Sequence, residues 1–410
     1  MDRDLTELSA LVDALRRDRR TDPYRGRRQY SLAARELAER CAALVDAGDG
    51  ATVVPVLRKA VDRMTAALTS MDDSSGIVGD DLQQIMHLYA RACATAPPDP
   101  KRLAAWLVQL ECDGPGWPRV LLRDFAPALG GKGIAEVERL VAERAATAGP
   151  DSWAGRFAIR DLREQLADVS GDIDRYVQVL AEHLESAQQY GRIVDVLRSA
   201  GRAAEAIDWA RRGLAAKSGW PGTEELRDAL VGMLLDRGGD GEALAVRAAE
   251  FERHPALAAY RAWAHTAARV GAADPAPAAV ERLRRHVAER PAYLPELVDV
   301  LTATGAHDEA WTAARADPDQ ISRQRWLTLI EHRTLTDPAG VIEPYARLVE
   351  LQVNDSGDKH RYRRAAQLIT ALQEACRAAG QQDRFAAYLT DFRDRYRRRP
   401  SLINALDEFR

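Results

Sequence analysis

The apolar positions of this chain recur at the spacing of α-helices from its first residues onward. One face of the first predicted helix carries the apolar residues Leu5, Leu8, Val12 and Leu15. A second helix is expected over residues 31–46, after a break at Asp22-Pro23. The segment around Val53 has strand propensity, but helical spacing continues to Leu68, which favours a helix with Pro55 in its first turn.

A glycine followed four residues later by Glu-Ala recurs along the second half of the chain. It occurs at Gly201, Gly238 and Gly305, with a degenerate copy at Gly271, so that successive glycines are 37, 33 and 34 residues apart. This period is typical of helix–turn–helix repeats, whose units bury their apolar faces only by stacking on their neighbours. Poorer copies are expected at Gly171 and Gly380, and Asp337-Pro338 takes the place of the turn between Gly305 and Gly380.

The helical periodicity and the recurring turns predict an all-α protein, an α-solenoid of antiparallel helical hairpins that forms a tetratricopeptide (TPR)-like superhelix. Five or six hairpins are expected from residue 165 to the end. The chain therefore divides into an N-terminal irregular helical-repeat region, residues 1–160, and a TPR-like helical-repeat region, residues 161–410. We expect the second region to continue the first.

Local signals mark several helix boundaries. Asp-Pro dipeptides at Asp99, Asp274, Asp317 and Asp337 predict helix starts, because the Asp side chain accepts from free backbone N–H groups and the Pro that follows has none. The glycine-rich stretch at residues 129–133 is predicted to be a loop.

Composition agrees with an all-α protein and sets limits on its partners. Apolar residues make up 46% of the chain, enough for a continuous core, whereas the aromatic residues that favour strands make up only 6%. The net charge is −4, so any contact with nucleic acid must come from a local basic patch rather than from the chain as a whole.

Targeting and redox signals point to the cytoplasm. The four cysteines, Cys41, Cys93, Cys112 and Cys376, lie far apart without a paired spacing, which is typical of reduced thiols. The first residues lack the apolar region of a signal peptide, and no apolar stretch is long enough to span a bilayer. We therefore expect a cytoplasmic protein without a membrane segment.

The sequence carries no recognisable catalytic, cofactor or metal motif. Its eight histidines are scattered singly, and none begins a His-Glu-x-x-His zinc motif. The glycine-rich stretch contains Gly131-Lys132, but a phosphate-binding loop would also need Gly at position 126, where the chain has Ala126, and Ser or Thr at position 133, where it has Gly133. We expect no catalytic residue, no cofactor and no metal, and hence a protein that is not an enzyme.

Two arginine clusters are the candidate contact residues. The first consists of Arg16, Arg17, Arg19, Arg20, Arg25, Arg27 and Arg28, with Tyr24 and Tyr30 between and beside them. The second consists of Arg395, Arg397, Arg398 and Arg399, which follow Arg393 near the end of the chain. Arginines with interleaved aromatic residues are typical of nucleic-acid contacts. The favoured interpretation is that these residues lie on the polar faces of amphipathic helices, paired with nearby carboxylates. Contact with an acidic partner protein is the next alternative, and contact with nucleic acid the one after it.

Eight tryptophans are many for a chain with so few aromatic residues. Four of them fall in the predicted repeats, namely Trp209, Trp263, Trp311 and Trp326. They are expected to pack between repeats, and the alternative is that some line a concave surface as peptide anchors.

Several segments, in the same order, resemble a known protein family. They are Ser70–Asp80, Ala96–Pro100, Arg384–Leu389 and Phe392–Glu408, and the resemblance extends over nearly the whole chain. Together they resemble the helical C-terminal region of bacterial, mostly actinobacterial, SWIM zinc-finger proteins. The turn Gly-Arg-x-x-Glu-Ala at residues 201–206 is in addition similar to the second half of a TPR.

This chain departs from that family at the zinc finger. The finger has the form Cys-x-Cys followed by Cys-x-His, and neither pattern occurs in this sequence. The resemblance thus implies the helical half alone, an interaction module, and carries over no zinc site.

Two hypotheses follow from the sequence. The first is a non-enzymatic helical-repeat scaffold or adaptor that binds one or more protein partners. The alternative is a nucleic-acid-associated protein that uses its arginine patches, together with a separately encoded zinc-finger protein or helicase. A steep fall of affinity with salt concentration would distinguish phosphate contacts from contacts with a protein partner.

Overall fold

The structure is a computed structural model of the chain. It describes residues 2–16, 23–69, 73, 75–147, 153–216 and 221–406. Within these ranges the chain forms α-helices, two short 3-10 segments and no β-strand. The predicted all-α solenoid of antiparallel helical hairpins is confirmed.

The chain divides into two compact units, Met1–Leu226 and Arg227–Arg410, and the boundary lies within helix α11. The helices up to that boundary are α1 (Asp2–Ala14), α2 (Pro23–Asp46), α3 (Gly50–Leu68), α4 (Ile77–Thr95), α5 (Pro100–Asp113), α6 (Leu122–Thr147), α7 (Trp153–Ser170), α8 (Ile173–Ala181), α9 (Ala187–Ser199), α10 (Ala203–Ala216) and α11 (Thr223–Asp236).

The second unit continues with shorter helices. They are α12 (Asp240–Arg253), α13 (Leu257–Arg269), α14 (Ala276–Glu289), α15 (Leu294–Ala303), α16 (His307–Ala316), α17 (Arg323–Thr334), α18 (Ile342–Asn354), α19 (Arg361–Ala378), α20 (Gln382–Arg395) and α21 (Pro400–Asn404). The 3-10 segments Pro291–Tyr293 and Pro318–Gln320 precede α15 and α17.

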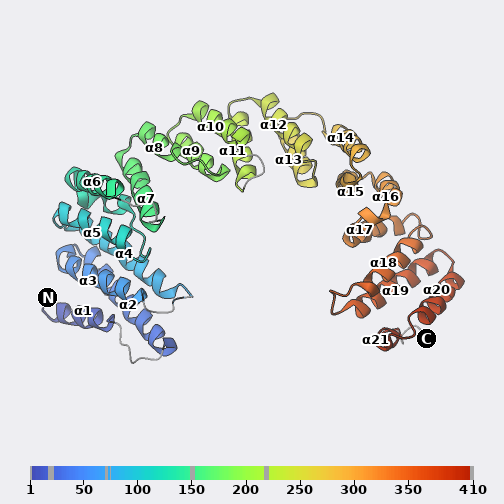
Figure 1. Cartoon of the computed structure of the whole chain (residues 1–410), viewed down its shortest axis with the longest axis horizontal. Coiled ribbons are helices and arrows are strands. Elements are labelled where there is room, and N and C mark those ends of the chain that lie inside the picture. Colours follow the sequence, from blue (N-terminus) through green and yellow to red (C-terminus); the bar gives the residue numbers. More distant parts are fainter. Residues whose placement is uncertain are drawn as a thin grey trace. The chain divides into compact units, whose positions relative to one another are not determined.

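Helices that follow one another in the chain pack side by side within each unit, as Figure 1 shows for α9 with α10 and for α18 with α19. After residue 165 the described helices form six complete hairpins, α9–α10 through α19–α20, in agreement with the five or six expected. A further hairpin, α7–α8, begins before that residue, at Trp153.

The predicted turn glycines all adopt the left-handed backbone conformation. Positive φ values occur at Gly171, Gly201, Gly238, Gly271, Gly305 and Gly380. At Gly201, where φ is +74°, the N–H of the next residue donates to the carbonyl of Leu197 at 2.8 Å and closes α9. A side chain with a Cβ atom would be strained in this conformation, which explains why glycine recurs at these corners.

The Asp-Pro dipeptides begin an α-helix at two of their four positions. Asp99 caps α5 by accepting from the N–H of Arg102 at 2.8 Å, and Asp274 accepts from the N–H of Ala276, where α14 begins. Asp317 precedes only a 3-10 turn, and Asp337 lies in a turn before α18. At Asp337 the carboxylate accepts from the N–H of Gly340 at 2.9 Å, so this residue stabilises the turn that lacks a glycine corner.

Three further boundary predictions need correction. The stretch 129–133 is a break of one residue rather than a loop, because two helical segments of α6 meet at Gly130, whose φ of 53° and ψ of −173° are not helical. Helix α2 begins at Pro23 rather than at residue 31, and α3 begins at Gly50, which places Pro55 beyond the first turn.

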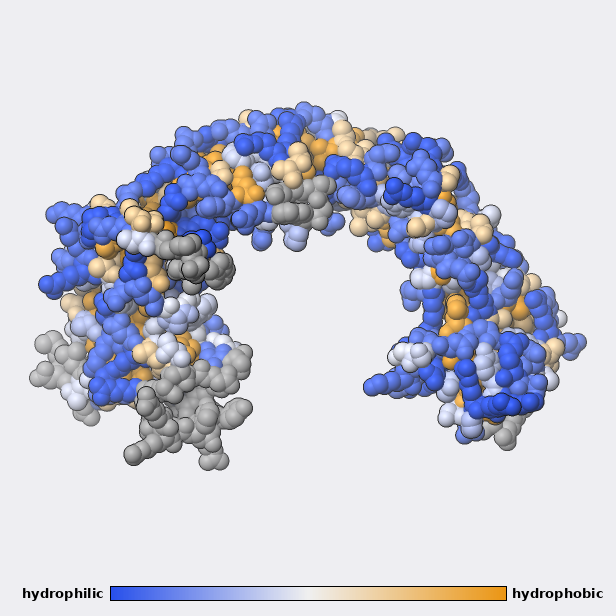
Figure 2. Space-filling model, viewed as in Figure 1, coloured by the Kyte–Doolittle hydropathy of each residue, from blue (hydrophilic) through white to orange (hydrophobic). Residues whose placement is uncertain are grey.

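Each unit has its own hydrophobic core. The first core runs from Leu8 to Leu166 and the second from Phe251 to Leu406. Polar side chains dominate the face shown in Figure 2, and the apolar ones appear there mainly as seams between helices. The two compact units meet at residue 226. The first hydrophobic core ends earlier, at Leu166, close to the domain boundary predicted at residue 160.

Candidate partner-binding surfaces

Most of the N-terminal arginine cluster lies outside what the structure describes. Arg17, Arg19 and Arg20 fall between the described ranges, and Arg25, Arg27 and Arg28 lie on α2 with side chains that are not described. Arg16 is exposed just after α1. This cluster therefore stays a prediction from the sequence.

The C-terminal cluster is largely engaged within its own chain. Arg395 pairs with Glu350 of α18 at 2.8 Å and with Asp391. Arg397 pairs with Asp394 at 3.2 Å. Exposed ion pairs of this kind contribute little stability, but they neutralise the charge that a phosphate would need.

Arg399 helps to attach the end of the chain to α18. Its guanidinium donates to the carbonyl of Val353 and to the side-chain oxygen of Asn354, both at 3.2 Å. Of the four cluster residues, Arg398 alone is exposed with no hydrogen bond or ion pair in the described chain. The local pairs with Asp391 and Asp394 have the helical spacing that the sequence predicts for nearby carboxylates. The contacts with α18 could not be predicted in this way, because their partners lie more than forty residues away.

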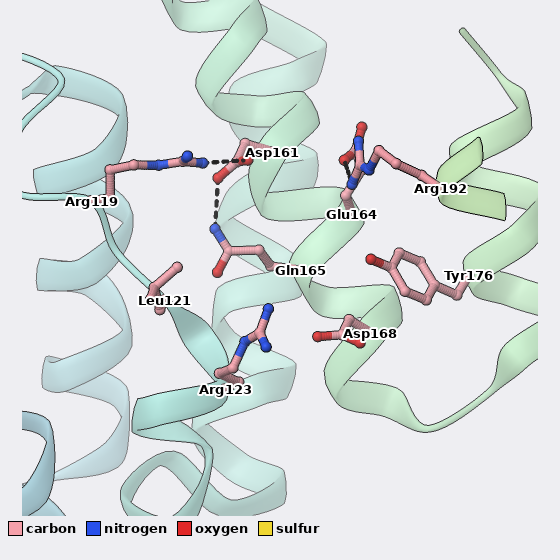
Figure 3. A pocket seen from close by; sticks show the side chains of 9 residues that line it. All are labelled: Arg119, Leu121, Arg123, Asp161, Glu164, Gln165, Asp168, Tyr176 and Arg192. Carbon is pink, nitrogen blue, oxygen red and sulfur yellow. Dashed lines mark hydrogen bonds and ion pairs between the residues drawn. The ribbon is translucent and has the colours of Figure 1, made fainter. Parts of the chain in front are cut away.

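A polar pocket of about 210 Å³ lies beside α7 in the first unit (Figure 3). We call it the α7 pocket. It is lined by Arg119, Leu121, Arg123, Asp161, Glu164, Gln165, Asp168, Tyr176 and Arg192. The four lining residues from α7 are spaced i, i+3, i+4 and i+7, so one face of this helix is polar along its length.

One wall of the α7 pocket is a hydrogen-bonded network around Gln165. The Gln165 amide group donates to Asp161 at 2.6 Å and to the carbonyl of Val120 at 2.9 Å, and its oxygen accepts from the N–H of Leu122 at 2.7 Å. Arg119 in turn donates to Asp161 at 3.1 Å. These contacts hold the segment before α6 against α7.

The opposite wall is built around Glu164. Arg192 of α9 pairs with this carboxylate at 2.6 Å, and Figure 3 shows the ring of Tyr176 below the pair with its hydroxyl directed into the pocket. Burial, together with the nearby Asp168 and Glu164 carboxylates, raises the pKa of Tyr176, although Arg192 opposes this shift. The tyrosine therefore stays neutral at physiological pH.

Two opposite charges in the α7 pocket have no partner. Arg123 and Asp168 are both exposed, and neither makes a hydrogen bond or ion pair through its side chain in the described chain. Figure 3 shows the two side chains pointing toward one another across the pocket. The other two arginines and two carboxylates of the lining are already paired with each other.

A second pocket, of about 260 Å³, lies on the second unit along α13, α15 and α17. We call it the α15 groove. It is lined by Leu257, Arg261, Val298, Asp299, Thr302, Ala303, Gln324, Arg325 and Thr328. The groove runs across the first helices of three successive hairpins, so residues from separate repeats contribute to one surface.

The α15 groove combines an apolar lining with one unpaired cation. Arg325 makes a two-pronged ion pair with Asp299, at 2.9 and 2.8 Å, and this hydrogen bonding raises the pKa of Arg325. Arg261 is exposed and has no hydrogen bond or ion pair in the described part of the chain. The groove therefore carries one net positive charge beside the apolar side chains of Leu257 and Val298.

The tryptophans of the repeats pack mainly in the core. Trp263, Trp311 and Trp326 are buried, and Trp311 meets Trp326 edge to face with ring centroids 5.7 Å apart. Trp209 is half-buried beneath the guanidinium of Arg212. The prediction that these residues pack between repeats is confirmed for the three buried ones.

Two of the scattered histidines come together in the fold. The rings of His307, at the start of α16, and His332, near the end of α17, stack with centroids 3.9 Å apart. Their separation of 25 residues corresponds to no local motif, so the sequence could not reveal this pair. Within the described ranges, no three His, Cys, Asp or Glu side chains gather to form a metal site.

The four cysteines are free thiols, and three of them are buried. Across the part of the chain that the structure describes, no helix combines the length and apolar character needed to cross a lipid bilayer.

Sequence inspection missed both pockets. The signal that could have revealed the α7 pocket is the run of Asp161, Glu164, Gln165 and Asp168, where a core-facing stripe would carry apolar residues. The α15 groove left no such signal, because its residues belong to three different repeats.

A family model matches this chain over residues 26–267, more than half of its length. The model is that of DUF6880, described as a family of unknown function. The chain belongs to this family. The match covers the α7 pocket completely but only part of the α15 groove. No curated protein matches the chain.

Solved structures with similar helical architecture are distant. A chain from a structure of Naa15/Naa10 bound to HypK-THB is 13% identical, with a TM-score of 0.32, and the match covers 95% of this chain. This chain spans 64% of the length of that one. Yeast Tom70 is 11% identical, with a TM-score of 0.24 and coverage of 93% and 88% of this chain and that chain. A circular tandem repeat protein is 16% identical, with a TM-score of 0.22 and coverage of 99% and 98%. Nothing about function follows from similarities this low.

Proposed function

We propose that this protein is a non-enzymatic helical-repeat scaffold that binds a protein partner. The observation that carries the proposal is the α15 groove, in which three successive hairpins contribute to one surface with an apolar lining and an unpaired guanidinium. A segment of a partner that presents an apolar side chain next to a carboxylate would fill this groove and neutralise Arg261. The four free cysteines fit a cytoplasmic setting, in which thiols stay reduced.

The charged groups of the groove support a binding role over a catalytic one. Its one ion pair, between Arg325 and Asp299, holds both charged groups in a stable contact and leaves neither of them available as an acid or a base.

The resemblance to the helical region of SWIM zinc-finger proteins belongs to the same proposal. We propose that this chain corresponds to the interaction module of such proteins and works without a finger of its own. A nucleic-acid role, with a separately encoded zinc-finger protein or helicase as partner, is the alternative. It would rest on the N-terminal arginine cluster, since the C-terminal arginines are mostly paired within the chain.

The test is affinity purification of the full chain from its source organism, with and without nuclease. The wild-type protein is compared with Arg261→Glu and with the matched control Arg285→Glu, which reverses another exposed and unpaired arginine, on α14 outside the groove. We expect a stoichiometric protein that survives nuclease, co-purifies with the wild type and the control, and is lost with Arg261→Glu.

Two results would contradict the proposal. If the co-purifying material disappears on nuclease treatment, the nucleic-acid alternative replaces it. If a nuclease-resistant partner binds Arg261→Glu as well as it binds the wild type, the α15 groove is not the docking surface.

A further inference from the structure

The α7 pocket has properties that a docking surface for a partner does not require. Its volume of about 210 Å³ is below the range of cofactor and drug-sized sites, about 300–1,000 Å³, and suits a molecule of the size of one amino acid. Eight of its nine lining residues have polar or charged side chains. A ligand for this pocket must therefore be small and strongly polar.

The charges of the lining determine what kind of small molecule would fit. Three arginines and three carboxylates line the pocket, and two ion pairs, Arg119 with Asp161 and Arg192 with Glu164, use four of these groups. Arg123 and Asp168 are left over, facing each other without an ion pair between them. A lone anion at Arg123 would meet the Asp168 carboxylate, and a lone cation at Asp168 would meet the Arg123 guanidinium.

Only a ligand with both charges satisfies both residues. We propose that the α7 pocket binds a small zwitterion, a free α-amino acid, with its carboxylate on the Arg123 guanidinium and its ammonium group on the Asp168 carboxylate. A guanidinium donates two parallel hydrogen bonds to a carboxylate, and an ammonium group donates to a carboxylate, so both contacts are charge-assisted. This inference goes beyond the scaffold function and does not depend on it.

The remaining lining residues hold the site in place before a ligand arrives. Gln165 is fixed by three hydrogen bonds, and Glu164 by Arg192, so neither wall has to rearrange. Within the described chain the ligand breaks no ion pair, because neither Arg123 nor Asp168 has one there. The pocket is open to solvent, and we expect a dissociation constant in the roughly millimolar range.

Binding would link two elements of the first unit. Arg123 lies in the first turn of α6, and Asp168 lies near the end of α7. An amino acid held by both residues would join the start of one helix to the end of the next. It would thereby stabilise this unit in proportion to the concentration of the ligand.

The experiment is saturation-transfer difference NMR on the full chain with a mixture of the common L-amino acids. We expect a difference signal from at least one of them with wild-type protein. The binding amino acid is then compared with its N-acetyl form, which keeps only the negative charge, and with its amide, which keeps only the positive charge. Each blocked form should bind at least about tenfold more weakly, since it loses one charge-assisted contact.

Variants locate the binding site. Arg123→Ala and Asp168→Ala should each weaken binding by about tenfold or more. Their matched controls are Arg198→Ala and Asp195→Ala, two exposed residues of α9 that lie outside the pocket and have no side-chain partner in the described chain. Unchanged circular dichroism spectra and melting temperatures would verify that all four variants fold.

The outcomes are decisive in either direction. Binding that depends on Arg123, on Asp168 and on both charges of the ligand supports the proposal. It is overturned if no common amino acid gives a signal, if the blocked forms bind as well as the parent, or if Arg123→Ala and Asp168→Ala bind like their controls. None of these results bears on the α15 groove, so the scaffold function is tested separately.

Discussion

Two segments of the molecule bury their apolar helix faces in different ways. They are α2–α6 of the first unit and α13–α19 of the second. The first uses long helices, up to the 24 residues of α2, whereas α15, α16 and α17 of the second have 10 to 12 residues. Helix α4 packs against α2, α3 and α6 and buries eleven of its residues. Helix α16 buries three.

The two regions therefore gain their stability in different ways. A helix that is buried on several sides, such as α4, forms the centre of a small core, because it packs extensively on its second neighbours α2 and α6 as well as on α3. In the second region the main contacts join consecutive helices, and those between second neighbours, such as α13 with α15, are sparse. Stability there is close to a sum of terms between neighbouring repeats, and damage should stay local.

The largest expected effect comes from removing a buried aromatic ring in each region. Trp326→Ala in the second and Phe125→Ala in the first should each cost about 3–5 kcal/mol of unfolding free energy, because both side chains are buried in packed cores. Hydrogen exchange measured by mass spectrometry should show faster exchange across α15–α19 for Trp326→Ala, with α3–α6 unchanged. For Phe125→Ala it should show faster exchange throughout α2–α6. If faster exchange extended equally far in both regions, the distinction between a core and an array would be wrong.

Two glycine substitutions should change the free energy of unfolding in opposite directions. Gly305→Ala forces an alanine into a corner where φ is +79°, and should destabilise the second region by about 1–2 kcal/mol. Gly131→Ala lies directly after the kink at Gly130, where a new Cβ atom would meet nothing within 4 Å, and should stabilise the first region by about 0.4–1 kcal/mol by restricting the unfolded chain. Urea denaturation of both variants measures the two changes. A stabilising Gly305→Ala would mean that the glycine corner is not required there.

The smallest effect concerns a buried carboxyl group of the first region. Burial raises the pKa of Glu111, although its carboxylate accepts from the N–H of Val120 at 3.0 Å. A raised pKa in the folded state means that the ionised form destabilises the fold, so this contribution to stability is present at low pH and is lost as the pH rises through the folded-state pKa. Glu111→Gln keeps the acceptor and removes the charge.

We therefore expect Glu111→Gln to melt slightly above the wild type at pH 7. The difference should shrink on acidification and vanish below the unfolded-state pKa of a glutamate, about 4.3. Melting curves across this pH range provide the measurement. A difference that grows on acidification would show that the charge is stabilised by its surroundings.

Local signals predicted corners and caps in both units. The glycine corners at Gly201, Gly238 and Gly305 were correct, because a left-handed turn depends on one residue and its immediate neighbours. The cap at Asp99 was correct for the same reason. At residues 129–133 the same kind of signal predicted too long a loop: the chain breaks only at Gly130, because packing of Leu129 and Val137 in the first core keeps both sides helical.

The pockets and the long-range arginine contacts could not be predicted as the corners and caps were, from local sequence signals. Arg123 and Asp168 are 45 positions apart, and nothing in their local sequence indicates that they face each other. Arg399 looked like a free cation in a basic run, yet its partners on α18 are 45 and 46 positions away. Such pairs arise only when helices dock, which no local period encodes.

The sequence by itself determined the helices, the positions of most corners and the class of fold, because helix periodicity and glycine conformation act within a few residues. The tertiary structure alone decided which charges are neutralised within the chain and which stay unpaired. That outcome depends on distances between side chains of different helices, and these distances exist only after the helices have packed. The α7 pocket and the α15 groove are products of this second step.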